Sequence, residues 1–427
     1  MKSHHVSAGV TVRHTCRICD SAELEDLFSL GTQWVNDFIR SEDAGKGVQC
    51  PLTLMLCHRC SLVQLRDTSP QDPMYRRFYW YRSGVTATMR AALREVSEAV
   101  ARTVRLEPGD VVLDVGSNDG TLLRSYDAPG IVTVGVEPAL NFAAEGAHGV
   151  DVFINDFWDY DLYAARVPRK AKAITAIGMF YDMEDPNQFI ADVARALDPD
   201  GVFVAQLMCL QNMLKINDLG NICHEHLEYY SCDSLDFLFG VHGLEIVDVE
   251  TNDVNGQSFR FYCRLRGSHL QPAVGASERL RRVKEAERDY RRPAMYRAFF
   301  DALGANRERC VDFIRGEVSR GKKVWVYGAS TKGNVILQFF GLDHSLIEGA
   351  SERSPEKYGK YTVGSMIPIH SEEEARAAKP DYFLVLPHAF IREFITREEA
   401  WLGGGGRFIL PLPEFRLVSS LADLEGR

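Results

Sequence analysis

The sequence predicts an α/β protein with a small amino-terminal unit followed by two larger units built on open, mostly parallel sheets. A chain of 427 residues is too long for one compact core, so about three domains are expected. Two CxxC pairs stand close to the amino terminus. Residues 108–123 and 321–340 each run as a buried strand, a glycine-containing turn and a helix, an order typical of ligand-binding α/β folds.

Composition limits the class of function. Hydrophobic residues make up 45% and charged residues 25%, as in soluble globular proteins rather than disordered or fibrous ones. A formal net charge of −10 argues against nucleic acids and acidic membrane surfaces as main partners. The sequence has no apolar run of about 18 residues, and its first residues lack the apolar core of a signal peptide. A cytoplasmic protein is expected, with its cysteines as thiols or metal ligands rather than disulfides.

The two CxxC pairs predict a structural zinc site. Two such knuckles supply four thiolates, the tetrahedral donor set that zinc prefers, and a closed set leaves no position for substrate or water. The expected ligands are Cys16, Cys19, Cys57 and Cys60. Cys50 and His58 stand nearby and could replace one of them. A redox CxxC pair explains only one knuckle and lacks a βαβ setting here.

A tyrosine-rich segment follows, from Met74 to Arg90. Its aromatic side chains would be costly to expose, so they either pack on the next domain or line a pocket. Tyr79 and Tyr81 share a face if the segment is extended. A phenol at such a position could donate a hydrogen bond to a developing charge.

The first strand and turn of the central unit predict a cofactor site. The turn is not the phosphate-binding GxGxxG loop, and two aspartates bracket it. This charge suits a cationic ligand such as S-adenosylmethionine better than a pyrophosphate. The expected contacts are Asp114, Gly116, Asn118, Asp119 and Gly120.

The next three strands add polar groups at their carboxyl ends, where α/β folds bind ligands. Glu137, followed by Pro138, is placed to accept both ribose hydroxyls, and Asn155 with Asp156 suits an adenine. The fourth strand ends at Met179, which we expect beside the cofactor, and then at Tyr181 and Asp182, which we expect beside the acceptor. Any one of these residues could instead cap a helix.

The stretch CHEHLEYY, residues 223–230, predicts proton-transfer chemistry beyond the fifth strand. An imidazole titrates near neutral pH and a carboxylate beside it can orient it, so His224, Glu225 and His226 are candidates for a general base. A zinc-protease helix is excluded because Glu228, not histidine, stands four residues after His224. A structural polar turn remains the alternative.

Two more strands, at 244–251 and 258–265, are joined by a short polar turn. Seven strands with this hairpin-like ending match the Rossmann-like sheet of class I methyltransferases. The segment 321–340 then repeats the strand, turn and helix plan in a second Rossmann-like unit, where Ser330, Lys332 and the helix start could hold a diphosphate. The alternative is a plain turn with a solvated lysine. His388, at a later strand end, is a possible ligand contact. The expected domains are 1–75, 76–270 and 271–427.

Taken together, CxxC…CxxC, YWYRSG, DVGSNDGTLL, GVEP, CHEHLEYY and YGASTKGN resemble the sugar C-methyltransferases of deoxysugar biosynthesis. The resemblance covers nearly the whole chain. It implies an amino-terminal zinc-binding domain, a central S-adenosylmethionine domain and a carboxyl-terminal Rossmann-like domain for the nucleotide half of the substrate. The implied substrate is a nucleotide-linked keto sugar, with dTDP as the expected nucleotide.

Matched residue by residue, the HEH motif of that family places the catalytic base at His226 beside Glu225, with His224 as a second candidate. Tyr79 falls in the segment that supplies an active-site tyrosine. The expected substrate contacts are Tyr81, Tyr181, Asp182, Tyr229, Arg260, Ser330 and Lys332. The sequence departs from the family pattern at Cys223, often tyrosine, at Asp182, where the family has histidine, and at Gln257, usually glycine.

The implied reaction begins when His226 removes a proton from the carbon beside the ketone, and Glu225 polarises the imidazole. The enolate then attacks the methyl group, while a tyrosine or His224 steadies the enolate oxygen. One alternative is an O- or N-methyltransferase on the same scaffold, whose acceptor already has a lone pair. Another is a zinc-dependent binding protein without catalytic activity.

Overall fold

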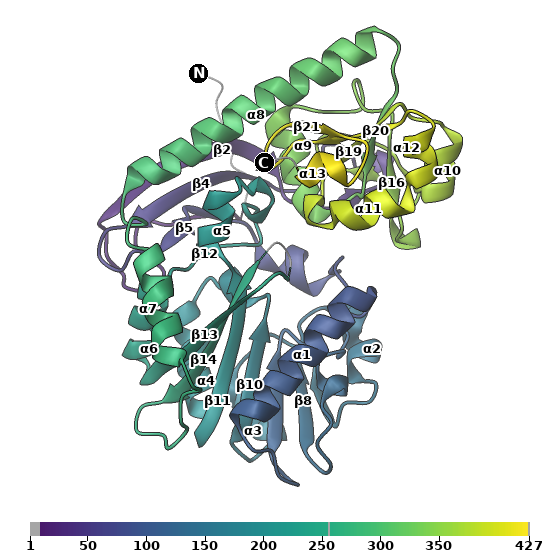
Figure 1. Ribbon diagram of the computed structural model, residues 1–427. Helices are drawn as coiled ribbons and strands as arrows, with labels where there is room; N and C mark the ends of the chain where they lie inside the picture. The colour runs from purple at the N-terminus through teal and green to yellow at the C-terminus, as the bar shows by residue number, and fades with distance from the viewer. Residues whose placement is uncertain (1–8, 255–256, 426–427) are drawn as a thin grey trace.

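The computed structural model describes residues 9–254 and 257–425. Its secondary structure forms a four-stranded, a seven-stranded and a six-stranded sheet, together with two short two-stranded sheets. The seven-stranded sheet lies at one end of the molecule, and the other two large sheets lie side by side at the opposite end beneath a long helix (Figure 1). The three large sheets correspond to the three units expected from the sequence.

The amino-terminal unit is an antiparallel sheet in the order β12-β5-β4-β2. Its strands from this part of the chain are β2 (Leu24–Trp34), β4 (Gln49–Cys57) and β5 (Val63–Leu65). The sheet packs against the 27-residue helix α8 (Pro293–Ser319), where Phe28 stacks on Phe300 with ring centroids 5.0 Å apart. The fourth strand, β12 (Glu228–Tyr229), comes from the CHEHLEYY stretch. The sheet therefore includes a segment of the central part of the chain.

The central sheet has the strand order β13-β14-β11-β10-β7-β8-β9, in which β14 runs antiparallel to its neighbours. This order confirms the predicted seven-stranded class I methyltransferase sheet. The strands are β7 (Val111–Val115), β8 (Val132–Val136), β9 (Val152–Ile154), β10 (Ala171–Ile177), β11 (Leu197–Met208), β13 (Leu244–Asn252) and β14 (Ser258–Leu265).

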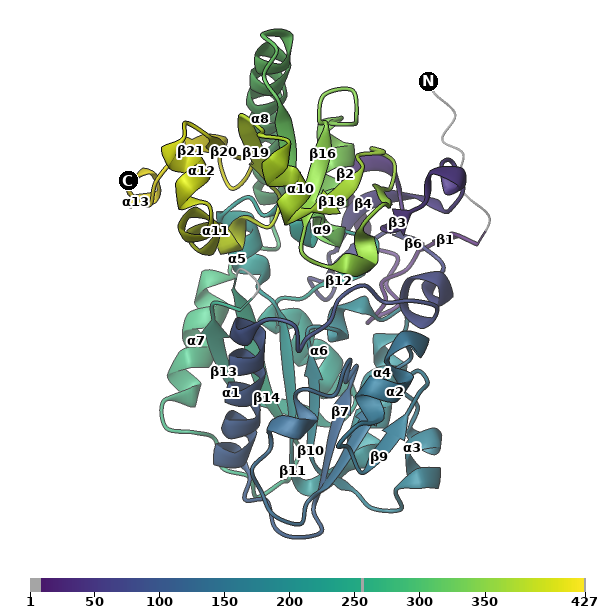
Figure 2. The ribbon, with the colours of Figure 1, turned by 90° about the vertical axis from the view of Figure 1, so that its right-hand side faces the viewer.

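Helices cover both faces of this sheet. Helix α1 (Ala87–Thr103) lies on one side, and α3 (Tyr160–Arg166) and α4 (Pro186–Ala196) lie on the other (Figure 2). Thr86 begins α1 by accepting a hydrogen bond from the Met89 backbone, and the apolar face of α1 is buried. The remaining helices of this unit are α2 (Ala143–Ala147), α5 (Leu210–Lys215), α6 (Cys232–Val241) and α7 (Ala276–Ala286).

The carboxyl-terminal unit is a second Rossmann-like sheet in the order β18-β16-β15-β19-β20-β21, with only β21 antiparallel among its pairs. Its strands are β15 (Val324–Tyr327), β16 (Gly349–Glu352), β18 (Ile369–Ser371), β19 (Tyr382–Val385), β20 (Arg407–Leu410) and β21 (Arg416–Val418). Its helices are α9 (Thr331–Phe340), α10 (Glu372–Ala377), α11 (Ile391–Arg397), α12 (Glu399–Gly403) and α13 (Ala422–Glu425).

Short contacts join the first and last units directly. Strand β3 (Phe38–Ile39) pairs with β17 (Tyr361–Thr362) in a two-stranded antiparallel sheet. Beside it, the Gln338 side chain accepts from the Trp34 backbone at 2.8 Å, and Asn334 donates to the Asp37 carbonyl at 3.1 Å. The domain boundaries expected at residues 75 and 270 stay predictions. Strand β12, from the central part of the chain, belongs to the amino-terminal sheet, and β17, from the carboxyl-terminal part, pairs with β3.

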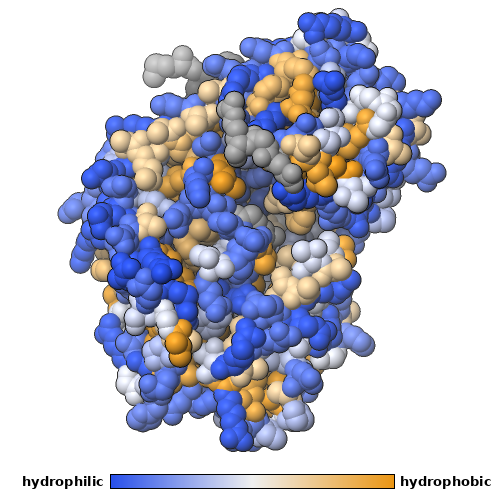
Figure 3. Space-filling view, in the orientation of Figure 1, coloured by the Kyte–Doolittle hydropathy of each residue, from blue (hydrophilic) through white to orange (hydrophobic). Residues whose placement is uncertain are grey.

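The surface in the view of Figure 3 is mostly hydrophilic, with its apolar residues in separate patches. Among the helices that the structure describes, none combines the length and apolar character needed to cross a bilayer.

Candidate functional site

Two adjoining cavities lie where the three units meet. The first, about 350 Å³, opens at the carboxyl ends of β7, β8 and β10 and is lined by Gly116, Glu137 and Met179, among others. The second, about 720 Å³, lies between this edge and the other two units. The residues that line both cavities include Tyr79, Tyr81, Met89, Gly178, Tyr181 and Lys332. Two ligands, one in each cavity, would therefore lie next to each other at these side chains.

The loop after β7 is held by Glu137, at the end of β8. Its carboxylate accepts hydrogen bonds from the backbone of Asn118 at 2.9 Å and of Ala139 at 2.8 Å. Burial raises the pKa of Glu137, and these two donors oppose the rise. The Asn118 amide in turn donates to the Tyr81 carbonyl, so the tyrosine-rich segment lies over the loop. Gly116, Asn118, Glu137, Pro138 and Met179 all line the first cavity.

Five residues expected at the cofactor form no part of the cavity wall in the described structure. Asp114 is buried below the loop and accepts from the Thr175 hydroxyl at 2.6 Å. Asp119 accepts from the Gly84 backbone. Gly120 closes the turn with a φ of +76°. Asn155 donates to the Glu137 carbonyl, and Asp156 pairs with Arg76 on the surface. Their cofactor contacts stay predictions.

His226 lines the second cavity, and a hydrogen bond defines its tautomer. Its Nδ1 lies 2.8 Å from the carbonyl oxygen of Asn221, which can only accept, so Nδ1 carries the proton and Nε2 has a free lone pair. The Tyr181 ring packs edge-on against the imidazole with centroids 4.6 Å apart. Burial, with Lys332 as a further cause, lowers the pKa of His226 to about 3. The ring is therefore neutral at physiological pH.

The two neighbours of His226 in the motif have other partners. His224 is buried away from the cavities, and its Nε2 contacts the Cys50 carbonyl at 3.0 Å, while burial lowers its pKa to about 4. Glu225 lines the second cavity and accepts from the Asn36 amide at 2.9 and 3.1 Å. In the described chain Glu225 forms no hydrogen bond with His226, because neighbouring residues of this turn point in different directions. Burial raises the pKa of Glu225.

Tyrosine hydroxyls surround the junction of the cavities. Tyr79 and Tyr181 line both cavities, and within the described residues neither phenol has a hydrogen-bond partner. Burial raises the pKa of each well above its usual value, so both keep their protons. Tyr81 is 42% exposed, and burial of its hydroxyl raises its pKa to about 12. Tyr229 lies behind the site and donates to the Asn221 carbonyl at 3.3 Å.

The remaining expected substrate contacts fall into two groups. Asp182 lines the first cavity, and Ser330 and Lys332 line the second at the start of α9. Burial raises the pKa of Asp182 well above its usual value, with Glu225 and Glu228 as further causes. Arg260 lies outside both walls, because it is buried in the sheet and pairs with Glu95 at 2.6 Å. Its substrate contact stays a prediction.

The four predicted zinc ligands come together in the amino-terminal unit. Their sulfur atoms all lie within 4.8 Å of one another, a donor set that fits a tetrahedral zinc thiolate site. The alternative ligands have other contacts, since His58 lies 3.1 Å from Glu25 and Cys50 contacts the Pro51 carbonyl. Four thiolates complete the coordination, so the metal is structural.

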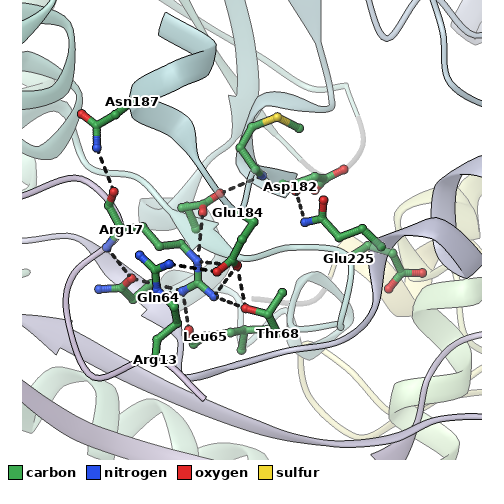
Figure 4. Close-up of polar contacts among 12 residues, drawn as sticks. Arg13, Arg17, Gln64, Leu65, Thr68, Asp182, Glu184, Asn187 and Glu225 are labelled. Carbon is green, nitrogen blue, oxygen red and sulfur yellow. Dashed lines mark hydrogen bonds and ion pairs between the residues drawn. The ribbon is translucent and has the colours of Figure 1, made fainter. Parts of the chain in front are cut away.

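Arg17, between two of these cysteines, ties the zinc knuckle to the HEH segment (Figure 4). Its fully buried guanidinium donates to the Thr68 hydroxyl at 2.6 Å and lies 3.3 Å from Glu184 and 3.5 Å from Glu228. Asn187 donates to the Arg17 carbonyl at 2.9 Å. Burial raises the pKa of Glu228, and Arg17 opposes that rise. These contacts of Arg17 therefore hold Glu228, which stands two residues after His226.

Sequence reasoning missed several partners of the predicted residues: Arg17, Asn36, Asn221 and Glu228. Asn36 stands in an irregular segment and Asn221 ends a single 3₁₀ turn, Leu219–Asn221, and no sequence pattern marks either residue. Arg17 had one signal, namely that it is a charged residue inside a CxxC knuckle, but the second knuckle also holds an arginine, Arg59, and that one is exposed.

Comparison with known proteins identifies the family. Three domain families match successive parts of the chain: a putative zinc binding domain at 16–75, a methyltransferase domain at 86–249 and a C-methyltransferase C-terminal domain at 253–413. The C-methyltransferase NovU of Streptomyces niveus is 34% identical over 413 residues, which are 96% of this chain and 98% of NovU. The chain belongs to the C-methyltransferases.

Two further similarities are partial. The sphingolipid C9-methyltransferase A of Emericella nidulans is 33% identical over 133 residues, 28% of this C-methyltransferase and 25% of that protein. A solved S-adenosylmethionine-dependent methyltransferase from Clostridium acetobutylicum aligns with 43% of this chain and 94% of its own, at a TM-score of 0.33 and 14% identity.

The first cavity of this C-methyltransferase fits S-adenosylmethionine as cofactor. Gly116 has a φ of +72°, and a Cβ there would lie 2.7 Å from Met179 Cγ, so glycine lets the backbone border the cavity closely. Glu137, Asp182 and Asp185 put polar carboxyl groups in its wall. The family favours carbon as the acceptor over the oxygen or nitrogen alternatives, and catalysis over simple binding.

Proposed function

We propose that this enzyme methylates a carbon beside the ketone of a nucleotide-linked keto-deoxysugar, with dTDP as the expected nucleotide. The observation that carries the proposal is the neutral His226 with a free Nε2 in the wall of the larger cavity, packed against Tyr181, which borders both cavities. A base at that position could accept a proton from a carbon of a ligand in the larger cavity while the methyl donor occupies the smaller one.

His226 acts in this proposal as the general base. Its bond to the Asn221 carbonyl orients Nε2 and keeps Nδ1 protonated. The low pKa of His226 makes it a weak base, so the acidity of the carbon must come from polarisation of the neighbouring ketone. The site therefore needs a strong hydrogen-bond donor beside the ketone oxygen.

Tyr79 and Tyr181 are the proposed donors to that oxygen. Both phenols keep their protons, border both cavities and lack protein partners within the described chain. His224 is the poorer candidate, because its ring is engaged with Cys50 behind the cavity wall. S-adenosylmethionine supplies an electrophilic methyl group when bound. Glu225, fixed by Asn36, is proposed to hold a polar group of the acceptor instead of polarising His226.

The larger cavity supports a nucleotide diphosphate as the remote part of the substrate. Ser330 caps α9 by accepting from the Gly333 backbone at 3.0 Å, and the first turn of this helix faces the cavity. The cationic residues of the wall are Lys46, Arg77, Arg82 and Lys332. Trp34 and Trp80 add apolar surface suited to a base.

Solvent exchange tests this proposal directly. The protein is incubated in deuterium oxide with S-adenosylhomocysteine and a panel of nucleotide-linked keto sugars, and deuterium uptake is read by mass spectrometry. Wild-type protein should exchange the proton at the carbon it methylates. The variant His226→Asn should lose at least about a hundredfold in exchange and in methyl transfer, because general-base catalysis contributes about that much.

The matched control is His344→Asn, a change at an exposed histidine of the carboxyl-terminal unit. It should exchange and transfer as wild type does, and both variants should bind S-adenosylmethionine alike. Undiminished exchange in His226→Asn would remove its role as base. Methyl transfer without any exchange by wild-type protein would argue against enolate chemistry.

A further inference from the structure

Lys332, in the first turn of α9, reaches from the carboxyl-terminal unit to the segment that carries His226. Its Nζ donates to the Asn221 side-chain oxygen at 2.6 Å, across more than a hundred residues of sequence. It borders both cavities. One cation thus touches the catalytic segment and faces the space proposed for the diphosphate.

Asn221 is the junction between Lys332 and the base. Its carbonyl accepts from His226 Nδ1 at 2.8 Å, and its side-chain amide donates to Asp218 at 2.8 Å. The residue is only 4% exposed, so Lys332 and Asp218 hold it from two sides. A shift of Asn221 would move the carbonyl that sets the tautomer of His226.

The charged surroundings of the imidazole support the same link. Tyr181 and Tyr229 approach from the turn after β10 and from β12 as neutral phenols. Cys223 and Glu225 precede it in the chain, and Glu225 is held by Asn36. Lys332 is the nearby cation that lowers the pKa of His226 in addition to burial. An anion that offset this cation would raise the proton affinity of the ring.

We propose that Lys332 is a positioning residue for His226, which orients the base through Asn221 and makes it respond to an anionic group bound at the start of α9. The identity of that anion as a substrate diphosphate rests on the proposed function, whereas the Lys332–Asn221–His226 contacts do not. Binding of the remote anion would then prepare the base for the proton at the reacting carbon.

Nitrogen-15 NMR of histidine-labelled full-length protein tests the link without substrate, and the signal lost in His226→Asn assigns His226. Wild-type His226 should stay neutral with Nδ1 protonated down to about pH 5, given its low pKa. In Lys332→Met its signals should shift, and its protonation should begin at least about half a pH unit higher, because the cation is gone. Inorganic pyrophosphate should move the signals in the same direction in wild type but not in Lys332→Met.

Two variants make the test specific. Asn221→Ala keeps the backbone carbonyl but removes the contact with Lys332, so the His226 signals should shift as in Lys332→Met, while the onset of protonation should move less because the cation remains. Lys322→Met removes an exposed cation that pairs with Asp381, and it should leave the His226 signals unchanged. Retained S-adenosylmethionine binding would show that Lys332→Met is folded; if it is not, Asn221→Ala and Lys332→Arg carry the test. His226 signals identical to wild type in both Lys332→Met and Asn221→Ala would overturn the proposal.

Kinetics separate this role from simple phosphate binding. If Lys332 only bound the diphosphate, Lys332→Met would raise KM and leave kcat unchanged; the positioning role predicts that kcat falls at least about fivefold as well. An NMR shift in a protein that methylates no keto sugar would leave the positioning role standing and remove the proposed substrate. Normal methylation of a keto sugar, together with unchanged His226 signals in Lys332→Met and Asn221→Ala, would support the proposed substrate and remove the positioning role.

Discussion

Gly116 marks the closest approach of the loop after β7 to the cofactor cavity. Its φ of +72° lies in the left-handed region, and an added Cβ would lie 2.7 Å from Met179 Cγ. A side chain here would both strain the loop and displace Met179, which also lines the cavity. The end of β7 and the wall of the cavity therefore require glycine at position 116.

We predict that Gly116→Ala weakens S-adenosylmethionine binding about tenfold or more, since such strain costs about 1–3 kcal/mol. Isothermal calorimetry measures the change. Gly243→Ala is the matched control, because Gly243 has a φ of +77° in the same unit but no atom within 4 Å of the added carbon. Equal losses of affinity in the two variants would show that general destabilisation, not the cavity, is responsible.

Asp114 gives a pH-dependent prediction at the same scale. Burial raises its pKa to about 7, while the Thr175 hydroxyl opposes the rise and Glu137 adds to it. The folded protein therefore holds this proton more tightly than the unfolded chain, whose pKa is near 3.8. The stability that this group contributes to the folded protein is therefore full below pH 4 and is lost as the pH rises towards 7.

Asp114→Asn should remove that loss, because asparagine keeps an acceptor for Thr175 without a charge. Relative to wild type, the variant should gain about 1–4 kcal/mol in free energy of unfolding between pH 4 and pH 8. Urea denaturation at a series of pH values measures the difference. A difference that stays constant with pH would mean that Asp114 is ionised in the folded protein throughout.

The sequence supports prediction of these side chains better than of their partners. The ring of His226 and the ammonium group of Lys332 carry recognisable chemistry, so they could be singled out from their motifs. Asn221 and Asn36 could not, because an asparagine in a single 3₁₀ turn or in a loop has no period or spacing that marks it. The sequence suggested His226 as the partner of Glu225, because the two residues are adjacent. In the structure the Glu225 carboxylate instead accepts a hydrogen bond from the Asn36 amide.

At the scale of elements, β12 connects the sheet of the zinc-binding unit with His226. It pairs with β5, and Leu227 just before it donates to the Tyr181 carbonyl at 2.8 Å. Arg17 reinforces this strand through Glu228. The position of His226 thus depends on the edge of a sheet that belongs to another unit.

We predict that Arg17→Met lowers the free energy of unfolding by about 3 kcal/mol or more, because it leaves buried acceptors and carboxyl groups without their donor. Methyl transfer should fall while the zinc content stays at one per chain, since all four cysteines remain. Urea denaturation, metal analysis and a transfer assay measure the three quantities. Arg59→Met is the control, because Arg59 also stands between the two cysteines of a CxxC knuckle but is exposed.

The large elements could be predicted where β12 could not. Long apolar runs such as those of β7 and β11 reveal buried strands, and the glycine turns after β7 and β15 mark where helices follow. A two-residue strand has no periodicity of its own. Its pairing is decided by distant residues of β5, which single-sequence patterns do not connect.

At the scale of the whole molecule, the zinc-binding unit supports the site around His226 and lines the cofactor cavity only with its last residues, Gln71 and Tyr75. It supplies Asn36 to Glu225, β5 to β12 and Arg17 to the segment after His226. The cofactor cavity is built mainly from the central unit. Loss of zinc should therefore separate cofactor binding from catalysis.

We predict that removal of zinc with a chelator abolishes methyl transfer in proportion to the metal lost, whereas S-adenosylmethionine affinity changes by no more than about twofold. Metal analysis, the transfer assay and calorimetry are run on the same samples. Cys50→Ser serves as control, because Cys50 is buried outside the four-sulfur cluster and should leave zinc in place. Zinc-free protein with full activity would show that the support is dispensable.

The pairing of β3 with β17 limits how such enzymes can be recombined. Residues 34–39 meet the carboxyl-terminal unit through β17, Gln338 and Asn334, and most of them also line the larger cavity. A chimera that takes its carboxyl-terminal half from a relative would lose these contacts unless residues 34–39 came from the same parent. Exchange of both segments together is the crossover design most compatible with an intact acceptor pocket.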